Sequence, residues 1–96
     1  MVFEWDPEKN RSNQMKHGVS FEEAIQVFNA RDETLELFDE RHSDFEDRFI
    51  TIGPTPGGLV LVVWTERLDE IVRVISARWA TPREQRLYRS NMEHRR

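Results

Sequence analysis

The sequence contains no cysteine and no apolar run that approaches the length of a membrane span. Because none of its 96 residues is cysteine, disulfides, thiolate metal sites and cysteine nucleophiles are excluded. A chain of this kind fits a reducing cytosol, and we expect a cytoplasmic protein. No apolar stretch approaches the ~20 residues that a transmembrane helix needs, and the N-terminus lacks the basic-then-apolar order of a signal peptide. We therefore expect no contact with a membrane.

Motifs for metal and nucleotide chemistry are also missing. The three histidines, His17, His42 and His94, have no neighbours at metal-ligand spacing. Gly57 and Gly58 belong to a predicted hairpin turn and form no phosphate loop. The sequence therefore predicts no metal and no cofactor.

The chain does contain enough apolar residues for one small domain, and its charge is unevenly distributed. Hydrophobic residues make up 38% and charged residues 33%, which predicts a single domain over residues 1–96. Residues 1–70 carry 7 basic and 16 acidic groups, net −9, whereas residues 71–96 carry 7 basic and 2 acidic groups, net +5. The basic part suits a phosphate backbone or an acidic partner; a merely solvated surface is an equally good interpretation.

Capping residues predict three helices. The first helix is predicted to begin at Asp6–Pro7 and to end at Gly18. Capping boxes mark the start of the second helix, at Ser20 and Glu23, and of the third, at Thr81 and Glu84. The first helix has almost no apolar face. Its polar side, with Asn13 and His17, either bonds neighbouring loops and caps the helix or lines a functional site. We expect Trp5 and Met15 to anchor its two ends.

Three β-rich segments predict consecutive strands, "RFITIGP", "LVLVVWTE" and "IVRVISARWA", joined by the turns "TPGG" and "RLDE". Short strands are expected at "VFEW" and "TLELF", with an exposed acidic loop over residues 39–47. Hairpins between neighbouring strands imply an antiparallel meander. The predicted fold class is α+β, with the helices segregated to a face of an antiparallel sheet.

Four-residue loops at both turns would place Thr65 opposite Val72 on one side and Arg48 on the other. The second helix would then cover the face that carries Ile50 and Ile52, while Arg73 would lie on the other face. Regular alternation separates Arg73 from Arg78 unless a bulge intervenes. An arginine among strand valines either forms an ion pair, here with Glu66, Glu36 or Glu84, or binds phosphate through its planar fork.

Histidine, arginine and tyrosine side chains together are sufficient to cleave RNA without a metal. The 2′-hydroxyl of RNA is an internal nucleophile. It requires in-line positioning, a proton acceptor, stabilisation of the phosphorane charge and a proton for the leaving oxygen. The basic and polar residues of this chain can supply these roles.

Several segments resemble the BrnT family of bacterial type II toxins. They are "FEWDPEKNRSNQMKHGVSFEEAIQVF", "RFITIG", "VVWTE", "IVRVISARWATPRE" and "RLYR". The resemblance implies a fold similar to RelE-type ribonucleases, with a small antiparallel sheet, two N-terminal helices and one C-terminal helix. It also implies a metal-independent endoribonuclease that inhibits translation. A cognate BrnA-type antitoxin with a ribbon–helix–helix region would neutralise it, and operator DNA would be bound only through the antitoxin complex.

Site residues follow from the resemblance and from the polar side of the first helix. The catalytic candidates are Lys16, His17, Arg48, Arg73 and Arg78, and the candidates for RNA contact are Asn13, Thr65 and Tyr88. The alternative interpretation is a non-catalytic module that uses the same basic surface to hold an antitoxin.

Overall fold

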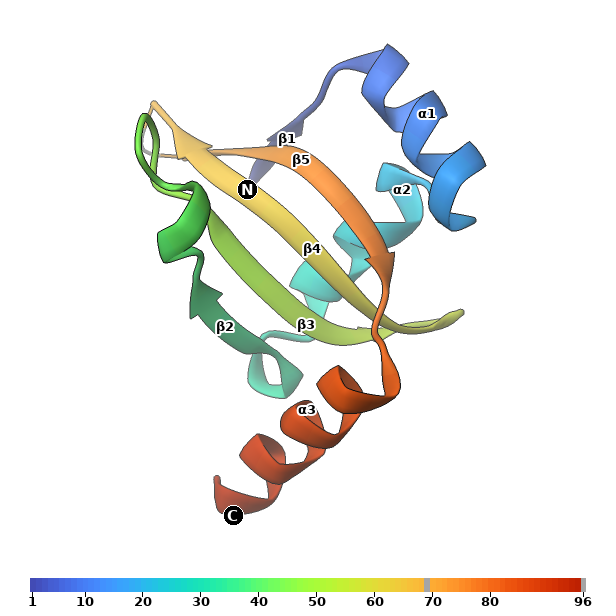
Figure 1. Ribbon diagram of the computed structural model, residues 1–96, viewed down its shortest axis with the longest axis vertical. Helices are drawn as coiled ribbons and strands as arrows, with labels where there is room; N and C mark the ends of the chain where they lie inside the picture. Colours follow the sequence, from blue (N-terminus) through green and yellow to red (C-terminus); the bar gives the residue numbers. More distant parts are fainter. Residues whose placement is uncertain (69, 96) are drawn as a thin grey trace.

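One five-stranded sheet forms the body of the protein. The computed structural model describes residues 1–68 and 70–95. The strands are β1 (Val2–Glu4), β2 (Leu35–Phe38), β3 (Phe49–Thr55), β4 (Gly58–Arg67) and β5 (Ile71–Trp79). They lie in the order β1-β5-β4-β3-β2 (Figure 1). The prediction of an antiparallel sheet is wrong at one edge, because β1 pairs parallel with β5. No hairpin joins these two strands, so no turn dictates their relative direction.

The predicted caps are confirmed. The helices are α1 (Pro7–His17), α2 (Phe21–Ala24) and α3 (Pro82–His94), with 3-10 turns η1 (Ile25–Asn29), η2 (Arg31–Glu33) and η3 (Glu40–His42). Both capping boxes are present, and Gly18 ends α1 in the left-handed conformation. The second predicted helix is mostly 3-10, since α2 has only four residues and continues as η1. No helix in the described ranges is long and apolar enough to cross a membrane.

The strand register differs from the prediction at two points of β5. Arg67 pairs with Ile71, so the loop between β4 and β5 is one residue shorter than expected, and Thr65 lies opposite Arg73 instead of Val72. The predicted turn "RLDE" includes Asp69, which lies outside the described residues. A β-bulge follows, because Trp64 pairs with Val74 while Val63 pairs with Ser76. One extra residue in β5 shifts the alternation and places Arg73 and Arg78 on the same face.

The two faces of the sheet have different neighbours. The face that we call the covered face packs under α2 and η1, through the buried residues Val60, Val62, Val74, Ala77, Phe21, Ala24 and Val27. On the other, which we call the open face, α3 packs at one end, where Tyr88 and Met92 meet the cluster of Leu35, Ile52 and Leu61. In Figure 1, α3 lies beyond the end of β5 and leaves the middle of the sheet uncovered. The predicted assignment was therefore wrong, because α2 covers the face opposite Ile50 and Ile52.

Aromatic packing anchors helix α1 at its start, and apolar packing does not anchor its other end. Trp5 packs edge-on against Phe21, with 6.0 Å between ring centroids, as predicted. Met15 is 87% exposed, so the prediction that it anchors the other end is wrong. Polar side chains fasten that part of the helix, as described below.

Candidate functional site

Arg48, Thr65 and Arg73 form a row across three adjacent strands on the open face. Thr65 pairs with Arg73, and Phe49 pairs with Trp64, so Arg48 comes next to Thr65 as the pairing continues. Neighbouring strands are ~4.8 Å apart, which places the backbones of the two arginines about 10 Å from one another. Both side chains are half-buried, and each is long enough to reach a group bound between them. We call these three residues the cationic row.

The loop before β3 is held tightly at this row. The Thr65 hydroxyl donates to the Asp47 carbonyl oxygen at 2.6 Å, and the Arg48 backbone N–H donates to the Ser43 hydroxyl at 3.0 Å. The Arg48 Nε atom is buried and, within the described residues, has no hydrogen-bond partner. Glu46 lies 3.5 Å from it without a hydrogen bond. An unsatisfied buried donor is uncommon in native proteins, and here it belongs to a candidate phosphate ligand.

A carboxylate lies at the end of the cationic row. Glu4 on β1 pairs with Arg73, and its Oε1 atom lies 3.7 Å from Arg73 and 3.5 Å from Arg67. Sequence reasoning missed both Glu4 and Arg67. Only the parallel pairing of β1 with β5 brings Glu4 to this place, and no local pattern indicates that pairing.

Arg78 lies on the same face but at the opposite end. It pairs with Leu61, four residues along β4 from Thr65, which corresponds to about 13 Å along the strand. Its guanidinium donates two hydrogen bonds to Glu84, at 2.6 and 2.8 Å. These bonds lower the pKa of Glu84 to about 2 and raise the pKa of Arg78. Of the three partners predicted for a strand arginine, Glu84 is the one observed here.

Tyr88 joins α3 to the N-terminal end of β2. Its hydroxyl donates to the Glu33 carbonyl oxygen at 2.6 Å, and its burial raises the pKa of the phenol. The ring packs against the buried cluster that contains Leu35, Ile52, Leu61 and Ala80. Tyr88 therefore lies at the α3 end of the open face, away from the cationic row.

Asn13 takes a structural position. It is 8% exposed. Its side-chain NH₂ donates to the carbonyl oxygens of Ala77 at 2.8 Å and Val19 at 3.1 Å, and its oxygen accepts from the Ala77 N–H at 3.1 Å. Since β1 pairs with β5 only as far as Arg73, Asn13 supplies the partner that a longer β1 would provide for Ala77. Both amide hydrogens are used inside the fold, so we do not include Asn13 in the site proposed below.

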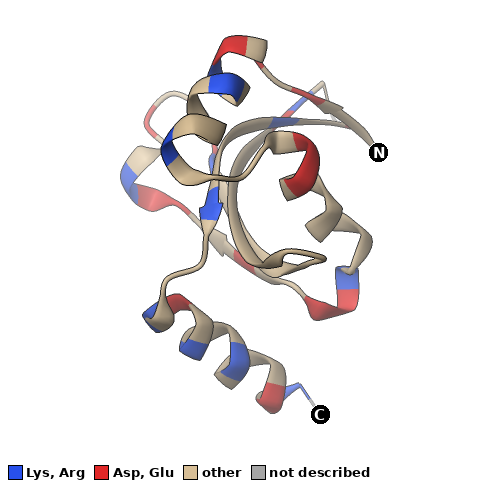
Figure 2. Ribbon diagram, turned by 90° about the vertical axis from the view of Figure 1, so that its right-hand side faces the viewer, with Lys and Arg blue, Asp and Glu red and all other residues tan. Residues whose placement is uncertain are grey.

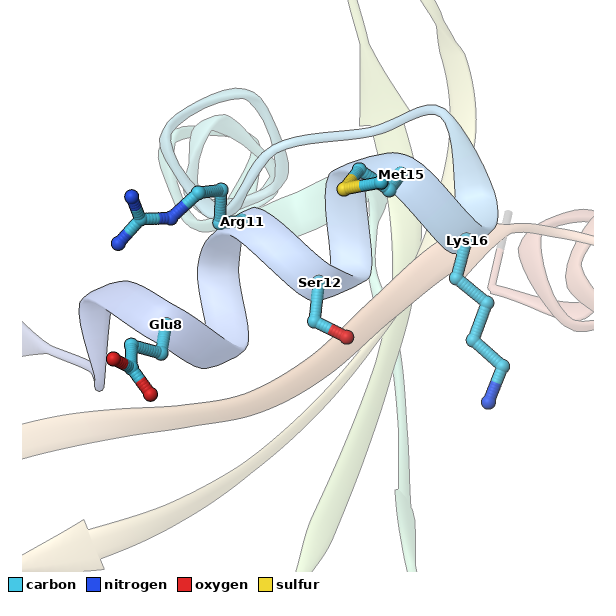
Figure 3. A pocket seen from close by; sticks show the side chains of 5 residues that line it. All are labelled: Glu8, Arg11, Ser12, Met15 and Lys16. Atoms are coloured by element: carbon cyan, nitrogen blue, oxygen red, sulfur yellow. The ribbon is translucent and has the colours of Figure 1, made fainter.

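Lys16 and His17 lie on the last turn of α1, beside β5. Lys16 is exposed and His17 is half-buried. Neither side chain forms a hydrogen bond or ion pair with any described residue. Figure 3 shows Lys16 extending away from the helix, at one end of a shallow depression lined by Glu8, Arg11, Ser12, Met15 and Lys16. All five residues belong to α1, so no second element closes this depression into a cleft.

The remaining charges are segregated. In Figure 2, blue ribbon segments, which mark Lys and Arg, recur along α3, and red segments, which mark Asp and Glu, lie on α2, on η2 and on the loop that follows β2. No group of three His, Asp or Glu side chains able to hold a metal ion occurs in residues 1–68 and 70–95.

The family model described as "Ribonuclease toxin, BrnT, of type II toxin-antitoxin system" matches residues 5–84. The chain belongs to the BrnT family. The predicted resemblance is therefore confirmed, and this family consists of ribonuclease toxins of type II systems. The matched range contains the cationic row, Arg78, Lys16 and His17; Glu4 and Tyr88 lie outside it.

A solved BrnT structure has a similar fold. The chain is similar to the ribonuclease toxin BrnT of Brucella abortus, with a TM-score of 0.62 and 25% sequence identity. The match covers 84% of this chain and 99% of that one. A comparison with curated proteins gave no match. The mixed α+β fold is thus shared with a BrnT toxin.

Proposed function

We propose that this chain is a metal-independent endoribonuclease whose cationic row binds the phosphate that is cleaved. The observation that carries the proposal is the placement of Arg48 and Arg73 on either side of Thr65, on the open face of the sheet, with both arginine side chains partly exposed. Two guanidinium groups can donate several charge-assisted hydrogen bonds to one phosphate. Membership of a family of ribonuclease toxins supports this assignment.

The proposed reaction is an in-line transesterification. The 2′-oxygen attacks the adjacent phosphorus while the bond from phosphorus to the 5′-oxygen breaks, giving a 2′,3′-cyclic phosphate and a 5′-hydroxyl. The proton of the 2′-hydroxyl passes to a base, and an acid protonates the leaving 5′-oxygen. Arg48 and Arg73 stabilise the charge of the phosphorane. Lys16 and His17 belong to the Trp79 end of β5, since Asn13 binds Ala77 and Gly18 lies beside Trp79, and there they meet a neighbouring part of the RNA.

The other candidates have supporting roles in this proposal. The Thr65 hydroxyl fixes the loop that presents Arg48. Arg78, held by Glu84, meets a neighbouring phosphate about 13 Å further along the sheet. Tyr88 contacts the RNA where it passes α3.

In the cell, we propose that RNA cleavage in the cytoplasm inhibits translation. A type II system pairs its toxin with an antitoxin, and we infer a BrnA-like ribbon–helix–helix protein that neutralises this chain. Operator DNA would be bound only through that complex.

The test is cleavage of RNA by the purified chain in EDTA. Arg73→Ala should lower the rate by about 10²–10³-fold, the loss typical of removing one donor to a developing oxyanion, with little change in melting temperature. Arg73→Lys should restore only part of the rate, since an ammonium lacks the bidentate fork. Arg86→Ala removes an exposed arginine of α3 and serves as the charge-matched control.

Two results would contradict this proposal. One is a folded wild-type chain that cleaves no RNA, or that loses activity in EDTA. The other is an Arg73→Ala variant that keeps its activity but no longer binds the antitoxin, which would favour the non-catalytic binding module.

A further inference from the structure

The sheet ends at β2 with an outer edge that no described strand pairs. Leu37 lies opposite Ile50 in β3, and beyond the strand the Asp39 N–H donates to the Arg48 carbonyl oxygen at 2.8 Å. In an antiparallel pair, residues alternate between facing the partner strand and facing away. Leu35 and Leu37 therefore direct their backbone groups to β3, whereas Glu36 and Phe38 direct theirs outward.

Several of the usual protections against pairing are missing along this edge. Native edges are often shielded by proline, lysine, a bulge or a covering helix, but β2 reads Leu-Glu-Leu-Phe and has a regular register with β3. Its apolar side chains are accessible, since Leu37 is 38% and Phe38 49% exposed. At the opposite side of the sheet, β1 has only three residues, and Asn13 of α1 binds the β5 edge at Ala77.

The charge around β2 selects the kind of partner. Residues 31–47, which contain β2, carry eight acidic side chains and two arginines, and the neighbouring loop adds a fully exposed Phe45. Such a surface repels the phosphates of RNA and attracts a basic segment of protein. An extended peptide with apolar side chains at successive positions would pack on Leu37 from one face and on Phe38 from the other.

We propose that a basic, extended segment of the antitoxin adds to β2 as a sixth strand. This inference rests on the proposed function, in which an antitoxin neutralises the chain. The added strand would lie about 10 Å from β3, two strand spacings away. From there, the residues that flank the segment can reach Arg48 and cover the cationic row.

The test uses the antitoxin encoded by the neighbouring reading frame, co-expressed with this chain. Glu36→Pro removes an outward-facing N–H while the bonds between β2 and β3 stay intact, because proline is tolerated on the solvent side of an edge strand. Glu36→Ala removes the same side chain but keeps the N–H. We expect Glu36→Pro to weaken binding at least tenfold and Glu36→Ala less than threefold, by titration calorimetry, with equal melting temperatures for the free variants.

Two further measurements probe the strand and the charge. Hydrogen exchange should show the amides of Glu36 and Phe38 becoming protected in the complex, while those of β1 stay unchanged. The triple variant Asp39→Asn, Glu40→Gln, Asp44→Asn should associate several-fold more slowly at low salt, and the difference should vanish as salt screens the charges.

The outcomes separate this inference from the proposed function. Absence of any complex with the wild-type chain would contradict the proposed antitoxin. A complex in which Glu36→Pro binds as tightly as Glu36→Ala, or in which β1 becomes protected instead of β2, would overturn the added strand and leave the ribonuclease proposal standing.

Discussion

The two faces of this sheet have different tasks, although they share the same strands. On the covered face, valines and alanines pack with Phe21 and Val27 at essentially zero exposure. On the open face, Arg48 and Arg73 are half-buried around the buried Thr65. Burying apolar area stabilises the fold, whereas a half-buried guanidinium adds little stability but remains available to a ligand. The packing of the covered face and the proposed phosphate site thus lie on opposite sides of one layer.

A single extra residue in β5 creates this division. The bulge lets Val72, Val74 and Ala77 all turn to the covered face, and it sends Arg73 and Arg78 to the open face. Bulges frequently change the direction of a side chain. Here the bulge places Arg73 and Arg78 on the same face, although they are five residues apart and regular alternation would separate them.

The largest expected effect comes from breaking the covered face. Phe21→Ala should destabilise the fold by about 3–5 kcal/mol, the usual cost of truncating a buried phenylalanine. Ile50→Ala on the open face, where the side chain is already half-exposed, should cost ~1 kcal/mol. Denaturant unfolding of both variants measures the difference. Equal costs would mean that the two faces contribute alike.

The next effect concerns Asn13, which fastens α1 beside the covered face. Asn13→Ala leaves the Ala77 N–H, the Ala77 carbonyl and the Val19 carbonyl without their partner, and should cost about 2–4 kcal/mol. Ser12→Ala, on the exposed side of the same helix, is the control. If Asn13→Ala kept its melting temperature but lost RNA cleavage, Asn13 would belong to the functional site after all.

Local signals in the sequence predicted the elements well. Caps at Asp6, Gly18, Ser20 and Thr81 act within one turn of helix, so their side chains are readable without knowing the fold. The Arg78–Glu84 pair was among the alternatives predicted for a strand arginine. The runs of β-branched and apolar residues between turns likewise placed β3 and β4.

The features that organise the site are non-local, and the sequence did not reveal them. The loop between β4 and β5 is one residue shorter than expected, and Thr65 therefore pairs with Arg73 instead of Val72. A shift of one residue in the register exchanges the faces of a strand. The pairing of Glu4 with Arg73 joins residues from opposite ends of the chain. Asn13 was predicted to contact RNA from its place on the polar side of a helix. A polar side chain that binds RNA and one that binds the edge of a strand give the same pattern in a sequence.

The smallest effect sharpens the comparison on the open face, where structure and charge meet. Glu84→Gln should keep the capping box of α3, since glutamine also serves at that position, but should lose the charge-assisted pair with Arg78. Because the pair is partly exposed, we expect a cost of only about 1–2 kcal/mol at neutral pH. Glu93→Gln, at the other end of α3, is the control and should cost nothing measurable.

The pH dependence of that loss has a defined sign. Folding lowers the pKa of Glu84 from 4.5 to about 2, so the folded state stabilises the ionised carboxylate. Its contribution is complete above pH 4.5 and disappears as the pH falls through about 2. Unfolding free energies of the wild type and Glu84→Gln should therefore converge between these values. A difference that persists at pH 2 would mean that Glu84 stabilises α3 through packing rather than through its charge.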